Sequence, residues 1–177
     1  MHPAPKLWKS GSMKQLTRLA VLSALALIAG CSPGAADAGA KAQPQAATAA
    51  VHPVSGLQIT PVTVTSGNGA HVFRSEVART SAEQAKGLMF RTEIGDDEGM
   101  IFLRNPPDIA SFWMRNTVIP LDIIFVGLDR RILNIAANAR PYDETPLPAD
   151  GPTLAVLEIN GGLAARLGIK PGDKVEW

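Results

Sequence analysis

From residue 57 to the C-terminus the chain repeats one pattern: short segments of alternating apolar and polar side chains, each followed by turn-forming residues. Alternation with a period of two places successive side chains on opposite faces of a strand, so the pattern predicts half-buried β-strands. Residues 57–60, 62–64 and 71–77 follow it, and residues 66–69 (SGNG) supply turn chemistry between them. We therefore expect a β-hairpin at the start of the domain.

Further strands and two short helices are predicted along the rest of the chain. Thr80 precedes an acidic first turn and caps a helix to about Leu88, and a second helix covers residues 162–167. Pro171 and Gly172 suit the centre of a type II turn. The remaining strand candidates are residues 100–103, 109–114, 121–126, 132–137 and 153–159, with turn signals at residues 105–107, 127–129 and 141–152. Seven or eight short strands with two short helices predict a mostly β (α+β) domain, a small closed or nearly closed β-barrel-like sheet.

The composition supports one folded domain and argues against nucleic acid as a partner. With 177 residues, 46% of them hydrophobic and 19% charged, the chain can form one packed core. Residues 31–177 hold 13 Lys and Arg side chains against 16 Asp and Glu, a net charge of −3, which is the wrong sign for a phosphate-binding surface. Aromatic residues make up 5%, too few for a platform that stacks single-stranded bases.

The N-terminus has the pattern of a secretory signal. Residues 13–18 (MKQLTR) are basic, and residues 19–28 form an apolar run that is too short to cross a bilayer as a helix. The run leads into LIAGC at residues 27–31, which resembles a lipobox, the site where bacterial lipoproteins are acylated on cysteine and cleaved before it. We expect residues 1–30 to be a signal peptide, with Met13 as a candidate start, and Cys31 to carry a lipid.

The residues from Cys31 onward predict where the protein acts. In the lipoproteins that this segment resembles, a residue other than Asp after the cysteine, here Ser32, favours the outer membrane over the inner one. The expected localisation is therefore the periplasm, with the membrane as a partner through the lipid. The sole cysteine excludes an intrachain disulfide and a multi-cysteine zinc site. Residues 31–56 have the Ala-, Gly-, Pro- and Gln-rich composition of a flexible tether, which leaves residues 57–177 as the folded domain.

Six short blocks in the folded part resemble a known family. They are residues 83–91 (EQAKGLMFR), 98–102 (EGMIF), 112–117 (FWMRNT), 120–123 (PLDI), 156–158 (VLE) and 167–173 (LGIKPGD). In this order and spacing they are similar to the motifs of the DUF192 (UPF0127) family, over about residues 70–177. The resemblance implies a compact β-barrel-like domain with short flanking helices. It implies little about activity, because the family is named for lacking an assigned function.

Residues 112–117 contain the first group of candidate ligand-binding residues. In a strand Trp113 and Arg115 share one face, and Phe112 and Met114 share the other. One interpretation is a pocket wall with Arg115 and Asn116 as polar anchors, where a guanidinium would suit a carboxylate or another small anion. The other is a structural corner, with Phe112 and Met114 packed in the core.

Two acidic residues lie within apolar strand segments. Asp122 follows Leu121, and Glu158 follows Leu157. A buried carboxylate without a partner is costly, so we expect Asp122 to be paired with Arg115, Arg91 or backbone amides. The two acids could act as a general acid and base, or they could hold loops through hydrogen bonds.

Other chemistries have weaker support in the sequence. Three methionines (Met89, Met100, Met114) beside Trp113 could offer soft ligands to Cu(I), but they are scattered and methionine is a common core residue, so we predict no metal site. No phosphate loop, nucleophile elbow or zinc-protease motif occurs, and we predict no cofactor.

Two functional hypotheses follow. The first is a membrane-tethered periplasmic binding or accessory domain that takes a small molecule, a glycan or a protein partner in the cell envelope. The alternative is a hydrolase-like enzyme of the cell envelope that uses Asp122 or Glu158 as acid or base, with Arg115 and Asn116 orienting the substrate. Carboxyl groups that open into a cleft favour the enzyme, and carboxyl groups saturated by backbone amides favour the binding domain.

Overall fold

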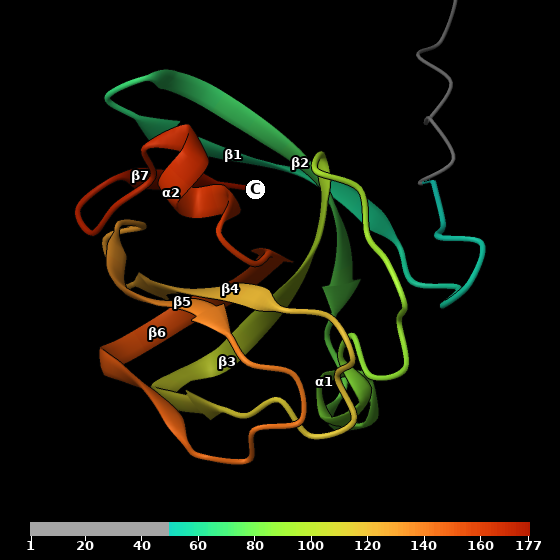
Figure 1. The fold of residues 1–177 in the computed structure, drawn as a ribbon. Coiled ribbons are helices and arrows are strands. Elements are labelled where there is room, and N and C mark those ends of the chain that lie inside the picture. The colour runs from blue at the N-terminus through green and yellow to red at the C-terminus, as the bar shows by residue number, and fades with distance from the viewer. Residues whose placement is uncertain (1–49) are drawn as a thin grey trace, which may run out of the picture. The chain divides into compact units, whose positions relative to one another are not determined.

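The computed structural model describes residues 50–177, which form one seven-stranded sheet and two short helices (Figure 1). The strand order across the sheet is β5-β4-β6-β3-β2-β1-β7. The prediction of a mostly β domain with two short helices is confirmed. The elements along the chain are β1 (Ile59–Ser66), β2 (Gly69–Ala78), α1 (Ser81–Lys86), β3 (Glu98–Phe112), β4 (Leu121–Gly127), β5 (Ile132–Ala139), β6 (Leu147–Asn160), α2 (Leu163–Leu167) and β7 (Lys174–Glu176).

The sheet curls until its two edge strands meet at one end. β5 and β7 are the outermost strands, yet Arg131, directly before β5, forms a bridge with Lys174 of β7. The backbone N–H of Ile132 also donates to the carbonyl of Asp173 at 2.9 Å. These contacts produce the nearly closed, barrel-like sheet that the strand pattern predicts.

One pair of neighbouring strands is parallel. β1 and β2 form the predicted antiparallel hairpin, whereas β2 and β3 run in the same direction and are joined by a crossover that contains α1. The helix begins where the sequence predicts, because Thr80 and Glu83 form a reciprocal capping box: the Thr80 side chain accepts from the Glu83 backbone N–H, and the Glu83 carboxylate accepts from the Thr80 N–H. The crossover places α1 beside β3.

Three features of the sheet differ from the strand pattern. β6 begins at Leu147, within the loop predicted at residues 141–152. The segments predicted at residues 100–103 and 109–114 belong to one strand, β3, because β6 pairs with both parts of it, and that strand ends at Phe112. The register shifts between Leu103 and Asp108, where Pro106 and Pro107 lack the N–H that a regular ladder needs. The three-residue strand β7 carries too short a pattern to be predicted, and only its pairing with β1 defines it.

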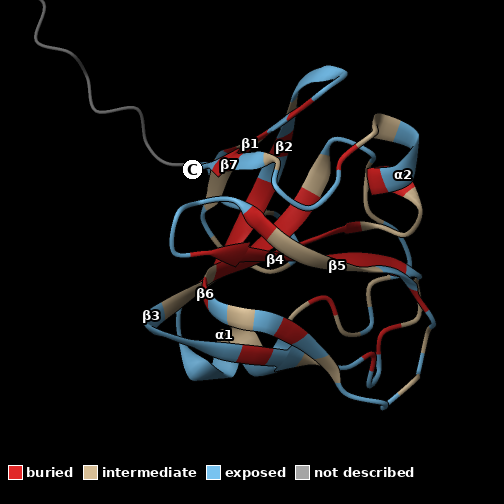
Figure 2. Ribbon diagram, turned by 90° about the vertical axis from the view of Figure 1, so that its left-hand side faces the viewer, coloured by how far each residue is buried: buried red, intermediate tan, exposed pale blue. Residues whose placement is uncertain are grey.

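Both faces of the central strands are covered, so two apolar clusters form on opposite sides of β3, β4 and β6. This explains why every residue of β4 is buried. Figure 2 shows the buried residues concentrated where these strands cross. The cluster on the face covered by α2 includes Val62, Phe73, Ile101, Ile124 and Leu157. The cluster on the opposite face, where α1 lies, includes Met100, Phe102, Ile123, Phe125 and Val156.

The described domain begins before the predicted boundary at residue 57. Val51 forms an antiparallel bridge with Gln58, and the N–H of Ile59 donates to the carbonyl of Ala50 at 2.7 Å. The His52 side chain lies 3.6 Å from the carboxylate of Glu76 on β2. Residues 50–56 are therefore paired with the domain in the structure.

The predicted signal peptide, Cys31 and most of the predicted tether lie outside the described residues. Within residues 50–177, neither helix has the length and apolar character needed to cross a membrane.

Candidate functional site

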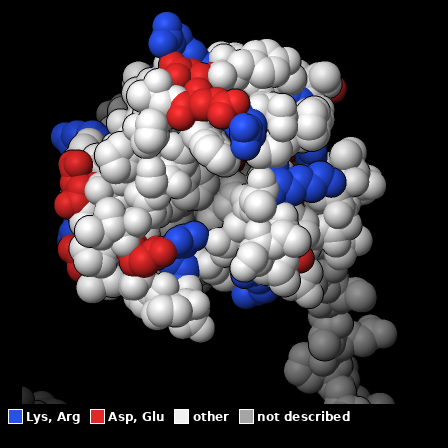
Figure 3. Space-filling model, turned by 90° about the horizontal axis from the view of Figure 1, so that it is seen from below, with Lys and Arg blue, Asp and Glu red and all other residues white. Residues whose placement is uncertain are grey.

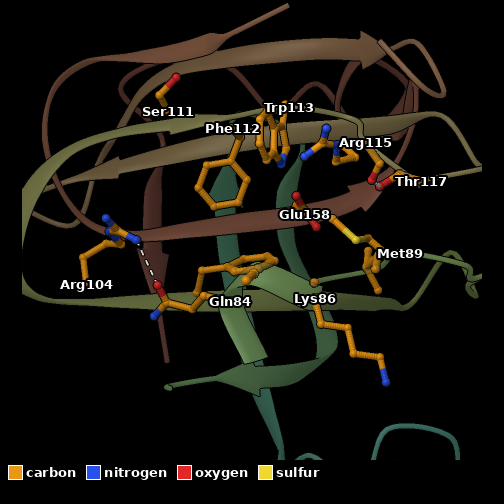
Figure 4. A pocket seen from close by; sticks show the side chains of 14 residues that line it. Gln84, Lys86, Met89, Arg104, Ser111, Phe112, Trp113, Arg115, Thr117 and Glu158 are labelled. Atoms are coloured by element: carbon orange, nitrogen blue, oxygen red, sulfur yellow. Dashed lines mark hydrogen bonds between the residues drawn. The ribbon is translucent and has the colours of Figure 1, made fainter. Parts of the chain in front are cut away.

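A cleft of about 270 Å³ opens between α1 and the end of β3. Residues of α1, β3 and β6 line it, together with the turn after α1 and the loop that follows β3. Figure 4 shows their side chains converging on the cleft, and Figure 3 shows this side of the molecule hollowed, with Lys and Arg side chains near the rim. The lining residues are Gln84, Ala85, Lys86, Gly87, Leu88, Met89, Phe102, Arg104, Ser111, Phe112, Trp113, Arg115, Thr117 and Glu158.

Gln84 fixes the α1 wall to the sheet. Its side-chain amide donates to the carbonyl of Leu103 on β3 at 2.9 Å. Its carbonyl oxygen accepts from the Arg104 guanidinium at 2.9 Å (Figure 4). Arg104 also donates to Asp108 through Nε at 2.8 Å, so its charge has a partner within its own strand. These hydrogen bonds define one side of the opening.

Aromatic rings form the opposite side. Phe112 packs edge-on against Phe102 with a centroid distance of 5.0 Å and an interplanar angle of 87°. Trp113 is 48% exposed and carries the Arg115 guanidinium 4.9 Å from its ring centroid. Arg115 also donates to Glu144 at 3.2 Å. The cleft therefore has a mostly apolar wall beside a cation that is already paired.

Glu158 on β6 brings a carboxyl group into this apolar setting. The residue is 5% exposed, and no donor among residues 50–177 makes a hydrogen bond to its carboxyl. The described residues contain no fully enclosed side-chain oxygen or nitrogen without a partner, so the Glu158 carboxyl reaches the open space of the cleft. Burial raises the pKa of Glu158 from 4.5 to about 8, so the carboxyl holds a proton at neutral pH.

Glu158 belongs to a row of side chains that crosses the sheet on one face. Residues paired across strands point to the same side, and the pairs here are Glu76 with Met100, Met100 with Glu158, and Glu158 with Ile123. The row contains a second buried acid, Glu76, but that carboxylate accepts from Arg91 at 2.7 and 2.9 Å. One acid in the row has its own cation, and the other faces the cleft.

Three of the five predicted site residues come together. Trp113, Arg115 and Glu158 line the cleft. Trp113 and Arg115 lie after the end of β3, so the strand alternation that predicted their shared face does not apply to them, although the Arg115 guanidinium lies 4.9 Å from the Trp113 ring centroid. Phe112 also lines the cleft, whereas Met114 is fully buried in the core.

Asp122 lies away from the cleft lining. It is 1% exposed, and its carboxylate accepts from the backbone N–H groups of Asn138 at 2.7 Å, Gly162 at 2.9 Å and Ala164 at 2.8 Å. Gly162 is the N-cap of α2 and has no side chain with which to cap the helix. Asp122 supplies that cap from β4, so backbone amides are its partners, one of the options predicted from the sequence.

Asn116 forms a corner beside the cleft. Its φ of 54° is in the left-handed region, which Asn tolerates better than most residues. Its carbonyl accepts from the N–H of Phe90 at 2.9 Å and ties this loop to the turn after α1. The Asn116 side chain is exposed and lies outside the cleft lining.

The sequence did not predict that Gln84 and Arg104 line the cleft, or that the buried Glu76 pairs with Arg91. A signal was present for Glu76, an acid within the apolar alternation of residues 71–77. Among the methionines considered for copper, Met89 lines the cleft, and Met100 and Met114 are buried in the apolar cluster on the α1 side. No group of three His, Cys, Asp or Glu side chains that could hold a metal ion occurs within residues 50–177.

Comparisons with known proteins identify relatives without an established activity. The profile of DUF192, a family described as uncharacterized, matches residues 62–177. A protein of unknown function from Novosphingobium aromaticivorans DSM 12444 is 88% identical, with a TM-score of 0.73 over 75% of this chain and 94% of that one. A Sinorhizobium meliloti 1021 protein described as a candidate transcription regulator is 34% identical, with a TM-score of 0.65 over 68% of this chain and 94% of that one. No curated protein matches the chain.

Proposed function

The chain belongs to the DUF192 family, and we propose that its cleft binds a small-molecule ligand in the cell envelope, where a lipid on Cys31 holds the protein to the membrane. The observation that carries the binding site is Glu158, a carboxyl 5% exposed, without a hydrogen-bond donor among residues 50–177, and open to a cleft. An unsatisfied polar group at such a position lowers stability, and a ligand that supplies the missing donor would remove the penalty.

Two further observations support a binding role. Trp113 presents a half-exposed ring at the cleft, and aromatic side chains with a few polar groups are typical of small-ligand sites. Asp122, the second acid of the enzymatic hypothesis, is saturated by three backbone N–H groups, which favours a structural role for it.

The lipid anchor and the periplasmic location rest on the sequence. The signal-like run, the small residues before Cys31 and the absence of any other cysteine support them. The Sinorhizobium relative is described as a candidate transcription regulator. The net charge of −3 over residues 31–177 of this chain argues against DNA binding, so we do not propose that role here.

Native mass spectrometry of the protein purified from the membranes of its own host tests the proposal. We expect a retained small molecule on the wild type and its loss in the Trp113→Ala variant, which removes an aromatic wall. Leu128→Ala, an exposed apolar side chain in the turn after β4, is the matched control and should keep the ligand. A wild-type protein whose mass is fully accounted for by its chain and lipid, under conditions that preserve weak complexes, would contradict the binding role.

One observation favours the enzymatic alternative. A carboxyl with a pKa of about 8 in an open cleft can act as a general acid at neutral pH. In that case Glu158 is the acid or base, without Asp122, and Arg115 lies at the same opening to orient a substrate. Conversion of the retained ligand by the wild type and not by Glu158→Gln would support this alternative.

A further inference from the structure

The two acids in the row across the sheet differ in one respect that points to the ligand. Glu76 and Glu158 lie on the same face, on either side of Met100, and both are at most 5% exposed. Glu76 accepts two short hydrogen bonds from Arg91. The fold therefore supplies a guanidinium to one buried carboxylate and leaves the other facing an open space.

Two of the three cations that line the cleft are paired with other groups. Arg104 pairs with Asp108 and Gln84, and Arg115 pairs with Glu144. The ammonium of Lys86 points away from Glu158 (Figure 4). Burial is the cause of the raised pKa of Glu158, and no cation among residues 50–177 acts against it. Glu158 is thus the acid of the cleft lining, and no cation among residues 50–177 pairs with it.

The walls around Glu158 suit the carbon part of a cationic ligand. Phe112 and Trp113 present ring surfaces, and Met89 presents a thioether. Aromatic faces attract cations and methionine is polarisable, so both favour a positive nitrogen with an apolar substituent. The cleft volume of about 270 Å³ suits a small molecule.

We propose that the cleft selects a small ligand with a protonated amine, whose ammonium group pairs with the carboxylate of Glu158 while its carbon skeleton lies against Phe112, Trp113 and Met89. This inference rests on the proposed function, since it names the ligand class for the same cleft. An anionic ligand is disfavoured because Arg104 and Arg115 already have acidic partners and the Lys86 ammonium points away from Glu158 (Figure 4).

Binding of an ammonium ion must move a proton. Glu158 is protonated in the free protein at neutral pH, so the ammonium displaces that proton to solvent as the ion pair forms. Below about pH 8 the affinity should rise up to tenfold for each unit of pH. The charged groups around the carboxyl are Lys86 from α1, Arg104 from β3 and Arg115 from the loop, with Glu76, Arg91 and His52 beyond Met100.

Three probes of nearly equal size separate the ligand classes by titration calorimetry on the full chain in detergent: benzylamine, benzyl alcohol and benzoate. We expect benzylamine to bind the wild type, with about tenfold higher affinity at pH 7.5 than at pH 6.5 and with release of a proton, measured in two buffers of different ionisation enthalpy. Glu158→Gln should lose at least tenfold in benzylamine affinity, and Leu128→Ala should lose nothing.

The opposite results are equally definite. Benzyl alcohol or benzoate binding as well as benzylamine overturns the amine inference while leaving a binding cleft in place. No binding of benzylamine at millimolar concentration also overturns it, and the ligand retained in native mass spectrometry then decides the proposed function separately. If Glu158→Gln does not fold, the pH dependence and proton release of the wild type still test the pairing.

Discussion

At the scale of single residues, Glu158 is where stability and ligand binding make opposite demands. Its position in the row between Met100 and Ile123 is one that an apolar side chain would fill without cost. The carboxyl instead stays buried without a partner among residues 50–177, and its pKa rises to about 8 because burial disfavours the charged form. Such a group destabilises the folded state at neutral and alkaline pH.

The pKa of Glu158 predicts how stability depends on pH. Between about pH 4.5 and pH 8 the folded state holds a proton that the unfolded state has lost, so the free energy of unfolding falls by up to about 1.4 kcal/mol per pH unit as pH rises. Glu158→Gln should remove this slope and be more stable than the wild type by about 3 kcal/mol at pH 7. Urea unfolding of both proteins at pH 5.5, 6.5 and 7.5 measures the difference. Parallel curves for the two would show that Glu158 does not bind the extra proton.

Asp122 differs from Glu158 because its buried carboxylate accepts hydrogen bonds from three backbone N–H groups, which stabilise the folded state. Asp122→Asn replaces one acceptor oxygen by an NH₂ group that faces backbone N–H groups, and should lower the free energy of unfolding by about 1–3 kcal/mol. Hydrogen exchange at Ala164, which loses the cap of α2, should accelerate in the same variant. The exposed Asp150 provides the control substitution, Asp150→Asn, with an expected change below about 0.5 kcal/mol. Equal stability of the two variants would contradict the capping role.

At the scale of elements, residues 50–56 belong with the sheet, although their composition resembles a linker. They pair with residues 57–59 and bring His52 against Glu76 and Arg91. That contact covers part of a buried ion pair, and an uncovered pair is exposed to water and weaker.

A chain that begins at Leu57 should therefore melt below one that begins at Ala50. We expect a decrease of about 4–8 °C, which corresponds to about 1–2 kcal/mol for a domain of this size. His52→Ala in the longer chain should reproduce part of the decrease, since it removes the side chain and keeps the strand pairing. Identical melting temperatures for the two chains would show that residues 50–56 add nothing to stability.

Local signals predicted most of the elements, and non-local pairing explains the rest. The hairpin of β1 and β2, the Thr80 cap and the Pro171-Gly172 turn depend on neighbouring residues and were predicted correctly. The positive φ of Gly172, 91°, is the conformation a type II turn requires. The continuity of β3 and the existence of β7 depend on β6 and β1, partners far away in the sequence.

The candidate site was predictable to the extent that its chemistry is visible along the chain. Trp113, Arg115 and Glu158 stand out as polar or aromatic residues within apolar segments. Gln84 reaches the cleft because the crossover folds α1 against β3, and nothing in its local sequence indicates that. The sequence also did not predict that Asp122 accepts from backbone N–H groups while Glu158 faces the cleft, because this depends on the register of the sheet.

At the scale of the whole molecule, the proposed lipid on Cys31 decides where the cleft works. Replacing Cys31 with Ala should release the protein from the membrane fraction of its host, because no other cysteine can be acylated. Fractionation followed by immunoblotting measures the distribution, with Ser32→Ala as a control that keeps the cysteine. If the Cys31→Ala protein sediments with membranes as fully as the wild type, the anchor lies elsewhere in the chain.

The crossover between β2 and β3 has a consequence for the rate at which a ligand enters. Gln84 donates to the carbonyls of Ala78, the last residue of β2, at 3.4 Å and of Leu103 on β3 at 2.9 Å, so the cleft wall cannot move outward without breaking these hydrogen bonds to the sheet. The cleft is then formed before any encounter, and capture is a single diffusional step. In stopped-flow mixing, the observed rate should increase linearly with ligand concentration and reach no plateau, as expected when no conformational gate precedes binding.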